Sequence, residues 1–215
     1  MPEKQPSIVT ISRQAASGGA YIGHLLARTL GYQYVEREVL HQAAGRLGVE
    51  LGELAVVEER RTGFLENLLK GFAFGTPEAA YLPPSRRPVY DHELFKAETS
   101  IIKTIASRYN AVVVGHGGYA VLKDHPGAIH VFIHAPLEFR IKRLQTFHNI
   151  SSDAAREEIE EADGRREKFL KTMTNTDWND ARNYHLAVDS QATGFDVAQR
   201  MIIELVEQTK RASRS

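Results

Sequence analysis

A ten-residue stretch near the start of the chain, SRQAASGGAY at residues 12–21, has the residue types of a loop that binds phosphate. Small residues let backbone N–H groups approach an anion, and a helix that begins directly afterwards adds the positive end of its dipole. In the usual pattern, G-x-x-x-x-G-K-[ST], a lysine and a hydroxyl residue stand where this sequence has Gly19 and Ala20. The predicted phosphate-binding residues are Ser12, Ser17, Gly18, Gly19, Ala20 and Tyr21. An ordinary tight turn between a strand and a helix would have similar residues.

A second glycine-rich stretch, VVVGHGG, places Gly115 and His116 directly after an apolar run that reads as a buried strand. Open α/β sheets bind ligands in the crevice outside the carboxyl ends of their strands. Glycine there allows a ligand to approach, and His116 is placed to touch it. The alternative is a glycine turn that carries a surface histidine.

Two groups of charged residues could act on phosphate. Arg140 and Arg143 are spaced i, i+3 on one face of a predicted helix. Guanidinium groups there could clamp phosphates or adenine. Asp163 and Arg166 form a D-x-x-R spacing, and such an arginine could neutralise charge on a phosphoryl group during transfer. Solvated charged helix faces would show the same spacings.

The composition excludes several classes of function. The chain has 27 basic and 27 acidic residues, so no global field draws it to nucleic acid or to an anionic membrane. It has no cysteine, which excludes disulfides and thiolate chemistry. The nine histidines show no metal-ligand spacing, so we expect no protein-ligated metal. The start, MPEKQPS, does not resemble a signal peptide, and no apolar run approaches the roughly 20 residues that span a bilayer, so we expect a cytoplasmic protein.

Short apolar runs alternate with amphipathic segments along the chain, which predicts an α/β fold with a parallel sheet covered on both faces. The expected strands are residues 8–11, 32–35, 111–114, 129–134 and 186–188. The expected helices are residues 23–30, 36–47, 51–74, 92–109, 137–147, 151–172 and 195–209, and residues 76–90 are expected to form a loop. Trp178 is expected to be a packing anchor, and His130 a structural or surface residue.

The order of these segments resembles the cytidylate kinase-like family, a branch of the nucleoside monophosphate kinases within the P-loop fold. The likeness covers nearly the whole chain, from the opening SRQAASGGAYIGHLLARTLG through VVVGHGGYAVLKDHP and IHVFIHAPLEFRIKRL to the closing NYHLAVDSQATGFDVAQRMI. It implies a P-loop kinase-type three-layer fold with a mainly parallel five-stranded sheet. It also implies one domain with a core at 7–49, 93–149 and 184–211, a helical acceptor-binding insertion at about 50–92, and a lid-like region at about 150–183.

The resemblance also implies roles for single residues. Arg13 would supply the positive charge that the absent lysine gives other loops. The residues implied to act in catalysis are Arg13, Arg140, Arg143 and Arg166, and those implied to face the acceptor are Glu36, Arg37, Gly115, His116 and Asp163. Three positions depart from the family pattern: Ala16 replaces a glycine, His116 an arginine, and Ile159 an arginine before Asp163.

The activity implied is transfer of the ATP γ-phosphoryl group to a nucleoside monophosphate such as CMP or dCMP. The cofactors would be ATP and Mg²⁺, with the metal held mainly by phosphates and water. Nucleotides would be the partners, without nucleic acid or membrane, and a homodimer is compatible with the sequence. Two alternatives stay open: a nucleotide-binding or regulatory protein that has lost catalysis, and a kinase of another small acceptor.

Overall fold

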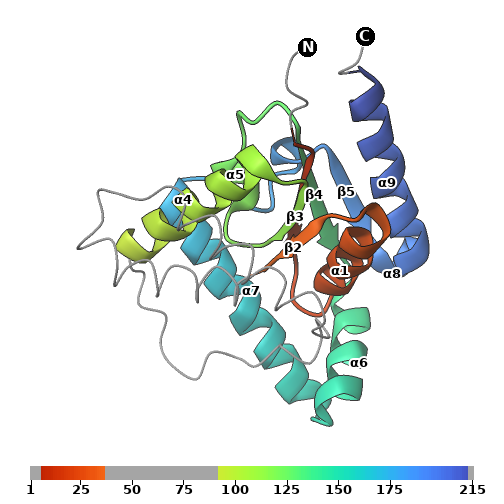
Figure 1. Cartoon of the computed structure of the whole chain (residues 1–215). Coiled ribbons are helices and arrows are strands. Elements are labelled where there is room, and N and C mark those ends of the chain that lie inside the picture. The colour runs from red at the N-terminus through yellow and green to blue at the C-terminus, as the bar shows by residue number, and fades with distance from the viewer. Residues whose placement is uncertain (1–5, 37–91, 213–215) are drawn as a thin grey trace, which may run out of the picture.

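The computed structural model describes residues 6–36 and 92–212, and all structural statements below concern these residues. Figure 1 shows their arrangement. In chain order the elements are β1 (Ile8–Arg13), α1 (Gly19–Leu30), β2 (Gln33–Val35), α4 (His92–Arg108), β3 (Ala111–Val114), α5 (Gly118–Val121), β4 (Ala128–His134), α6 (Leu137–His148), α7 (Ser152–Thr174), a 3₁₀ turn (Ala181–Asn183), β5 (Leu186–Asp189), α8 (Ser190–Thr193) and α9 (Phe195–Ala212).

The five strands form one sheet in the order β2-β3-β1-β4-β5, and every neighbouring pair is parallel. The central strand, β1, lies between two strands that come later in the chain. The carboxyl ends of β1, β3 and β4 therefore meet at one edge, where Ile11 pairs with Val114 on one side and with Val131 on the other. The turns that follow β1 and β3 are brought together at this edge.

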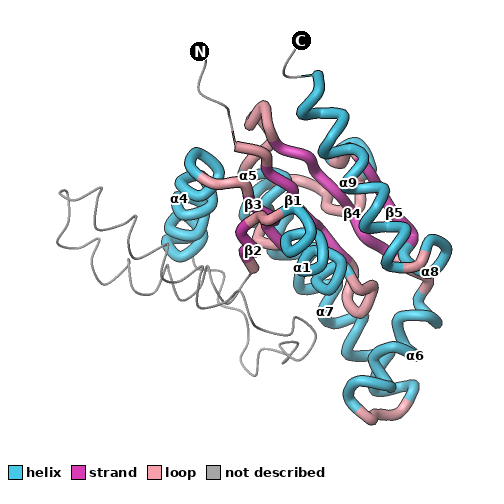
Figure 2. Tube along the Cα trace, turned by 45° about the vertical axis from the view of Figure 1, so that its right-hand side comes forward, coloured by secondary structure: helices cyan, strands magenta, loops and turns pink. Residues whose placement is uncertain are grey.

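Helices cover both faces of the sheet. Ile8 and Val113 face a core formed with α4, whereas Val9 and Val112 face a core formed with α1 and α9. Figure 2 shows the sheet between α4 on one side and α9 on the other. Since both faces of β1 are buried, its largely apolar, β-branched start, IVTI at residues 8–11, reflects its place at the centre of a parallel sheet.

The predicted α/β fold with a five-stranded parallel sheet is confirmed, and each predicted strand is present. The predicted helix at 151–172 is one helix, α7, which begins where the Ser151 hydroxyl accepts a hydrogen bond from the Ala154 N–H. The predicted helices at 36–47 and 51–74 and the loop at 76–90 lie outside the described residues, as does nearly all of the proposed insertion at about 50–92. Within residues 6–36 and 92–212, no helix is both long and apolar enough to cross a membrane.

His130 makes the stability of this fold dependent on pH. Burial, together with the nearby His185 and His125, lowers the pKa of His130 from 6.5 to about 4. The unfolded chain binds a proton here below about pH 6.5 and the folded chain does not. Stability should therefore fall as the pH drops from about 6.5 to about 4, and this contribution should then level off. In urea denaturation at pH values across this range, the free energy of unfolding should fall less steeply with decreasing pH for His130→Gln than for wild type. The control His92→Gln, at an exposed site, should keep the wild-type dependence on pH.

Candidate active site

The loop between β1 and α1 is held from inside by hydroxyl groups. Ser17 is fully buried, and its hydroxyl contacts the carbonyls of Gln14 at 2.9 Å and Ile133 at 3.2 Å. Ser190, at the start of α8, donates to the Ser17 carbonyl at 2.6 Å. Ser17 is one of the predicted phosphate-binding residues, but its hydroxyl proton is directed at carbonyls within the protein. Ser17 therefore shapes the loop.

The amino end of α1 presents backbone N–H groups. An α-helical N–H normally donates to the carbonyl four residues earlier, but Ile22 makes the first such bond, to Gly18. The carbonyls that Gly19, Ala20 and Tyr21 would use belong to Ala15, Ala16 and Ser17. These carbonyls accept instead from Arg140, Arg143 and Ser190. No side chain caps the helix, and its first turn has no acidic residue. The three N–H groups of 19–21 are thus directed out of the helix end, as in anion sites.

Arg13 occupies the space that the missing lysine would need. A Cβ atom at Gly19 would lie 2.5 Å from the Cβ atom of Arg13, and a Cβ atom at Gly115 would collide with its guanidinium nitrogen Nη1. Two glycines, one from each of the two loops, therefore make room for one arginine. The lysine position of the usual pattern holds glycine because Arg13 packs across it.

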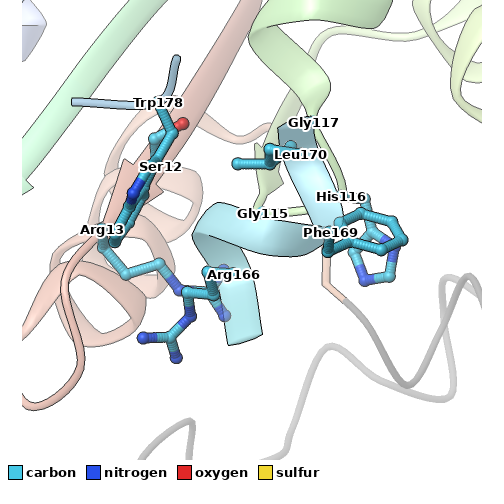
Figure 3. A pocket seen from close by; sticks show the side chains of 9 residues that line it. All are labelled: Ser12, Arg13, Gly115, His116, Gly117, Arg166, Phe169, Leu170 and Trp178. Carbon is cyan, nitrogen blue, oxygen red and sulfur yellow. The ribbon is translucent and has the colours of Figure 1, made fainter. Parts of the chain in front are cut away.

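A cavity of about 50 Å³ opens at the carboxyl edge of the sheet. Its wall includes five residues predicted from the sequence: Ser12, Arg13, Gly115, His116 and Arg166. In the view of Figure 3, Arg13 and Arg166 lie on one side, and His116 lies with Phe169 on the other. Since one water needs roughly 10–15 Å³ of such space, the cavity admits a small chemical group.

The sequence interpretation missed four residues of this wall, namely Gly117, Phe169, Leu170 and Trp178. Phe169 and Leu170 follow Arg166 at i+3 and i+4, so the helical period places all three on one face of α7. Trp178 is 3% exposed and meets the Phe132 ring edge to face at 5.6 Å. Its predicted packing role is confirmed, and it also lines the cavity.

His116 follows Gly115 in the turn after β3, and its backbone has a left-handed φ of 55°. Its Nδ1 atom lies 2.9 Å from Oε2 of Glu98 on α4. Both side chains are nearly buried, with exposed fractions of 9% and 6%. Glu98 was not singled out from the sequence.

Asp163 on α7 binds the loop directly. Its Oδ1 atom accepts from the Ala15 N–H at 2.7 Å and from Arg166 at 2.9 Å, and its Oδ2 atom accepts from Arg140 at 2.6 Å. Arg140 is 7% exposed and also donates to the carbonyls of Ala15 and Ala135. In this structure Asp163 and Arg140 hold the loop between β1 and α1, which differs from the expectation that they face acceptor and phosphate.

Arg143 and Ile159 also support the loop. Arg143 donates from Nε to the Ala16 carbonyl at 3.1 Å, and its guanidinium lies 4.5 Å from the centre of the Phe195 ring. Tyr21 packs against the same ring at 5.7 Å. Ile159 is 1% exposed in a core shared by α6, α7 and Ala15. The arginine expected by the family pattern is thus replaced by a residue that packs the two helices together.

The predicted pair Glu36 and Arg37 is only partly described. Glu36 accepts a hydrogen bond from the Tyr34 hydroxyl at 2.9 Å. Arg37 lies outside the described residues. Among the residues that the structure does describe, no group of three histidine, aspartate or glutamate side chains could hold a metal ion.

Ala16 is held in the left-handed region with a φ of 57°, at the position where the family pattern has glycine. This conformation costs an L-residue about 1–2 kcal/mol. Replacement by glycine removes this cost, but the greater freedom of glycine in the unfolded chain cancels part of the gain. Ala16→Gly should therefore raise the free energy of unfolding by about 0.5–1 kcal/mol, measured by urea denaturation. Ala154→Gly, at an ordinary helical position of α7, should lower it, and equal effects of both changes would contradict the assignment of strain to residue 16.

Comparison with known proteins adds to this geometry. A model described as "Cytidylate kinase-like family" matches residues 8–192. The chain is similar in structure to an uncharacterized protein from Eubacterium ventriosum ATCC 27560, with a TM-score of 0.69, 18% identity, and coverage of 94% of this chain and 98% of that one. It is also similar to a gluconokinase from Sinorhizobium meliloti 1021, with a TM-score of 0.51, 18% identity, and coverage of 98% and 99%. Comparison with curated protein sequences gives no match. The predicted P-loop kinase-type fold is confirmed.

Proposed function

The chain belongs to the cytidylate kinase-like family, and on this premise we propose that it transfers the γ-phosphoryl group of ATP to a small acceptor. The donor phosphates would bind at the amino end of α1, and the acceptor in the cavity beside His116. The family and the kinase-type fold support phosphotransfer as the class of reaction.

The observation that carries this proposal is the arrangement around α1. The carbonyls of residues 15–17 are held by Arg140, Arg143 and Ser190, so the N–H groups of residues 19–21 are left for an anion. Arg13 lies against Gly19, next to these N–H groups. Fixed donors aimed at phosphate oxygens stabilise the charge that develops during transfer, and they need little reorganisation.

The residues of the loop suit ATP phosphates, but they provide few protein ligands for Mg²⁺. Ala20 has no hydroxyl, and the Ser17 hydroxyl is engaged with carbonyls. Mg²⁺ would enter with ATP, held mainly by phosphates and water, and would supply charge neutralisation there. Arg13 and Arg166 would bind the phosphates, while Arg140, Arg143 and Asp163 would keep the loop in place.

The finer proposal concerns the acceptor. Two acceptor classes are open: the resemblance points to a nucleoside monophosphate, CMP or dCMP, whereas His116 in the cavity wall suits another small acceptor. A panel of both classes with ATP·Mg²⁺ in an ADP-coupled assay distinguishes them. Arg166→Ala should lower kcat at least about tenfold, because one charged donor to the phosphoryl group is lost. Arg156→Ala, an exposed arginine on the same helix paired with Glu138, is the matched control and should behave as wild type. Turnover of CMP that is insensitive to Arg166→Ala would remove this mechanism.

A second candidate function is nucleotide binding without catalysis. The specific observation in its favour is the loop itself, which has glycine and alanine in place of the lysine and the hydroxyl residue. Calorimetry separates the candidates: ATP binding with no product from any acceptor, water included, supports the second. A protein that binds neither ATP nor CMP at millimolar concentration supports neither.

A further inference from the structure

His116 places an imidazole in the wall of the cavity and has a carboxylate behind it. Its Nδ1 atom lies 2.9 Å from Oε2 of Glu98, and both side chains are nearly buried. A carboxylate oxygen only accepts hydrogen bonds, so Nδ1 carries the proton of this contact. In the neutral ring with this tautomer, the other nitrogen, Nε2, has a lone pair that can accept a proton. This arrangement of carboxylate and imidazole is that of a positioned base.

The backbone at His116 is held in a conformation that glycine would adopt with less strain. His116 has a φ of 55° and lies between Gly115 at 84° and Gly117 at 64°. L-residues in this region persist where the surrounding structure fixes them, and such residues gather at functional sites. A third glycine would make the same turn, so the imidazole is what this position adds to the cavity.

The two possible kinds of acceptor need different chemistry. The oxygen of a monophosphate is already anionic, and proteins recognise it best with a paired guanidinium donor. The residue in the cavity wall at this turn is His116, which contacts through single nitrogens and offers no paired donor. A hydroxyl acceptor instead loses a proton as its oxygen bonds to phosphorus, and a positioned base accelerates this step by about 10²–10⁴-fold.

We propose that the group phosphorylated is a hydroxyl and that His116 is its general base, an inference that rests on the proposed transfer from ATP. The hydroxyl oxygen bonds to the γ-phosphorus while the bond from this phosphorus to the β,γ-bridging oxygen breaks. ADP leaves, and the hydroxyl proton passes to Nε2 of His116. Glu98 is a positioning residue that holds the ring and stabilises the imidazolium. Phe169 and Leu170 line the same cavity.

Replacement of His116 by glycine tests the base directly, because glycine suits the left-handed backbone and leaves a space the size of imidazole. The assay follows the γ-phosphate label from ATP·Mg²⁺ to water, glycerol, D-ribose and D-glucose, and separately to CMP and dCMP. Wild type should label a hydroxyl group, water included, in preference to the phosphate group of CMP or dCMP. His116→Gly should lower this rate at least about 100-fold, and added imidazole should raise the rate of the variant at least about tenfold.

Two further variants test whether the loss of rate and its rescue are specific to the imidazole of His116. His116→Asn keeps a side chain that tolerates this backbone, and it should lose the rate without rescue by imidazole. His148→Gly removes the histidine of another histidine–glutamate pair, that of His148 and Glu158 at 3.5 Å, which is not part of the cavity wall. It should keep the wild-type rate with and without imidazole. The KM for ATP should be unchanged in all three variants.

The outcomes separate this inference from the function on which it rests. Transfer only to the phosphate group of CMP or dCMP, giving CDP or dCDP, a His116→Gly rate within threefold of wild type, or the absence of imidazole rescue would each overturn the base role while leaving phosphotransfer intact. ATP binding by wild type without transfer to any acceptor, water included, would overturn it as well. Failure of wild type to bind ATP·Mg²⁺ in calorimetry would instead remove the proposed function itself.

Discussion

Replacing Arg13 by glycine is expected to lower kcat for phosphoryl transfer by about 100- to 1,000-fold, the effect of losing one fixed donor to developing charge. The KM for ATP should rise as well, because Arg13 would contact the bound phosphates before and during transfer. The physical reason is the place of this side chain, which lies between Gly19 and Gly115 where the two loops meet. Steady-state kinetics with the best acceptor, or with water, measures the loss.

The matched experiment exchanges the two positions. In the usual pattern the first glycine falls at residue 13 and the lysine at residue 19, so Arg13→Gly combined with Gly19→Lys writes GQAASGKA at residues 13–20. Gly19→Lys alone should impair folding or activity, since its Cβ atom would lie 2.5 Å from that of Arg13. With glycine at 13 this clash is gone. The kcat of the double variant should therefore be at least about tenfold higher than that of Arg13→Gly. Two independent positions would not show this coupling.

The second large effect is expected for Asp163→Ala. Asp163 accepts hydrogen bonds from the Ala15 N–H, Arg140 and Arg166, and Arg140 is nearly buried. Removing the carboxylate leaves a buried guanidinium and a loop N–H without their acceptor, which should lower the free energy of unfolding by about 3 kcal/mol. The affinity for ATP should fall too, because α7 no longer holds the loop. Urea denaturation and calorimetry measure the two effects.

The control for this variant is Glu138→Ala, which breaks the exposed pair of Glu138 with Arg156. Exposed pairs contribute little, so its urea midpoint should stay within error of wild type. Asp163→Asn should lie between the two, because the amide oxygen can still accept from the Ala15 N–H while the charge facing Arg140 is lost. A wild-type midpoint for Asp163→Ala would contradict the role of this residue as the clamp of the loop.

The sheet was predictable because its strands are buried on both faces. Residues 111–114 are a continuous apolar run, and residues 8–11 are apolar and β-branched except for Thr10, as is typical of strands inside a parallel sheet. Their carboxyl ends carry the loop and the turn, so the sequence also placed Arg13, Gly115 and His116 at one site. The cavity brings these three together with Arg166, as the interpretation of the sequence expected.

The orientation of single side chains was less predictable. The sequence places Arg140 on one face of α6 and Asp163 on one face of α7. Which partner each side chain meets depends on how the two helices pack against the loop. Ser17 looked like a phosphate donor, and only the position of the Ile133 carbonyl shows that its hydroxyl is directed inward. That Gly19 makes room for Arg13 also depends on packing across the loop, which spacing alone does not report.

Glu98 could have been found from the sequence. Leu94, Glu98, Ile101 and Ile105 follow each other at helical intervals on one face of α4. A single carboxylate within an otherwise apolar stripe must be paired when buried, and here it meets His116. A charged residue on the buried face of a helix was the signal for a partner at the site.

The central claim is that ATP phosphates bind at the amino end of α1 with Arg13 in place of the usual lysine. A crystal structure of the full chain with Mg²⁺ and a non-hydrolysable ATP analogue tests it most directly. In that structure, β- and γ-phosphate oxygens should lie within hydrogen-bond distance of the N–H groups of residues 19–21 and of the Arg13 guanidinium. Phosphates bound elsewhere, or bound here with Arg13 turned away from them, would contradict it.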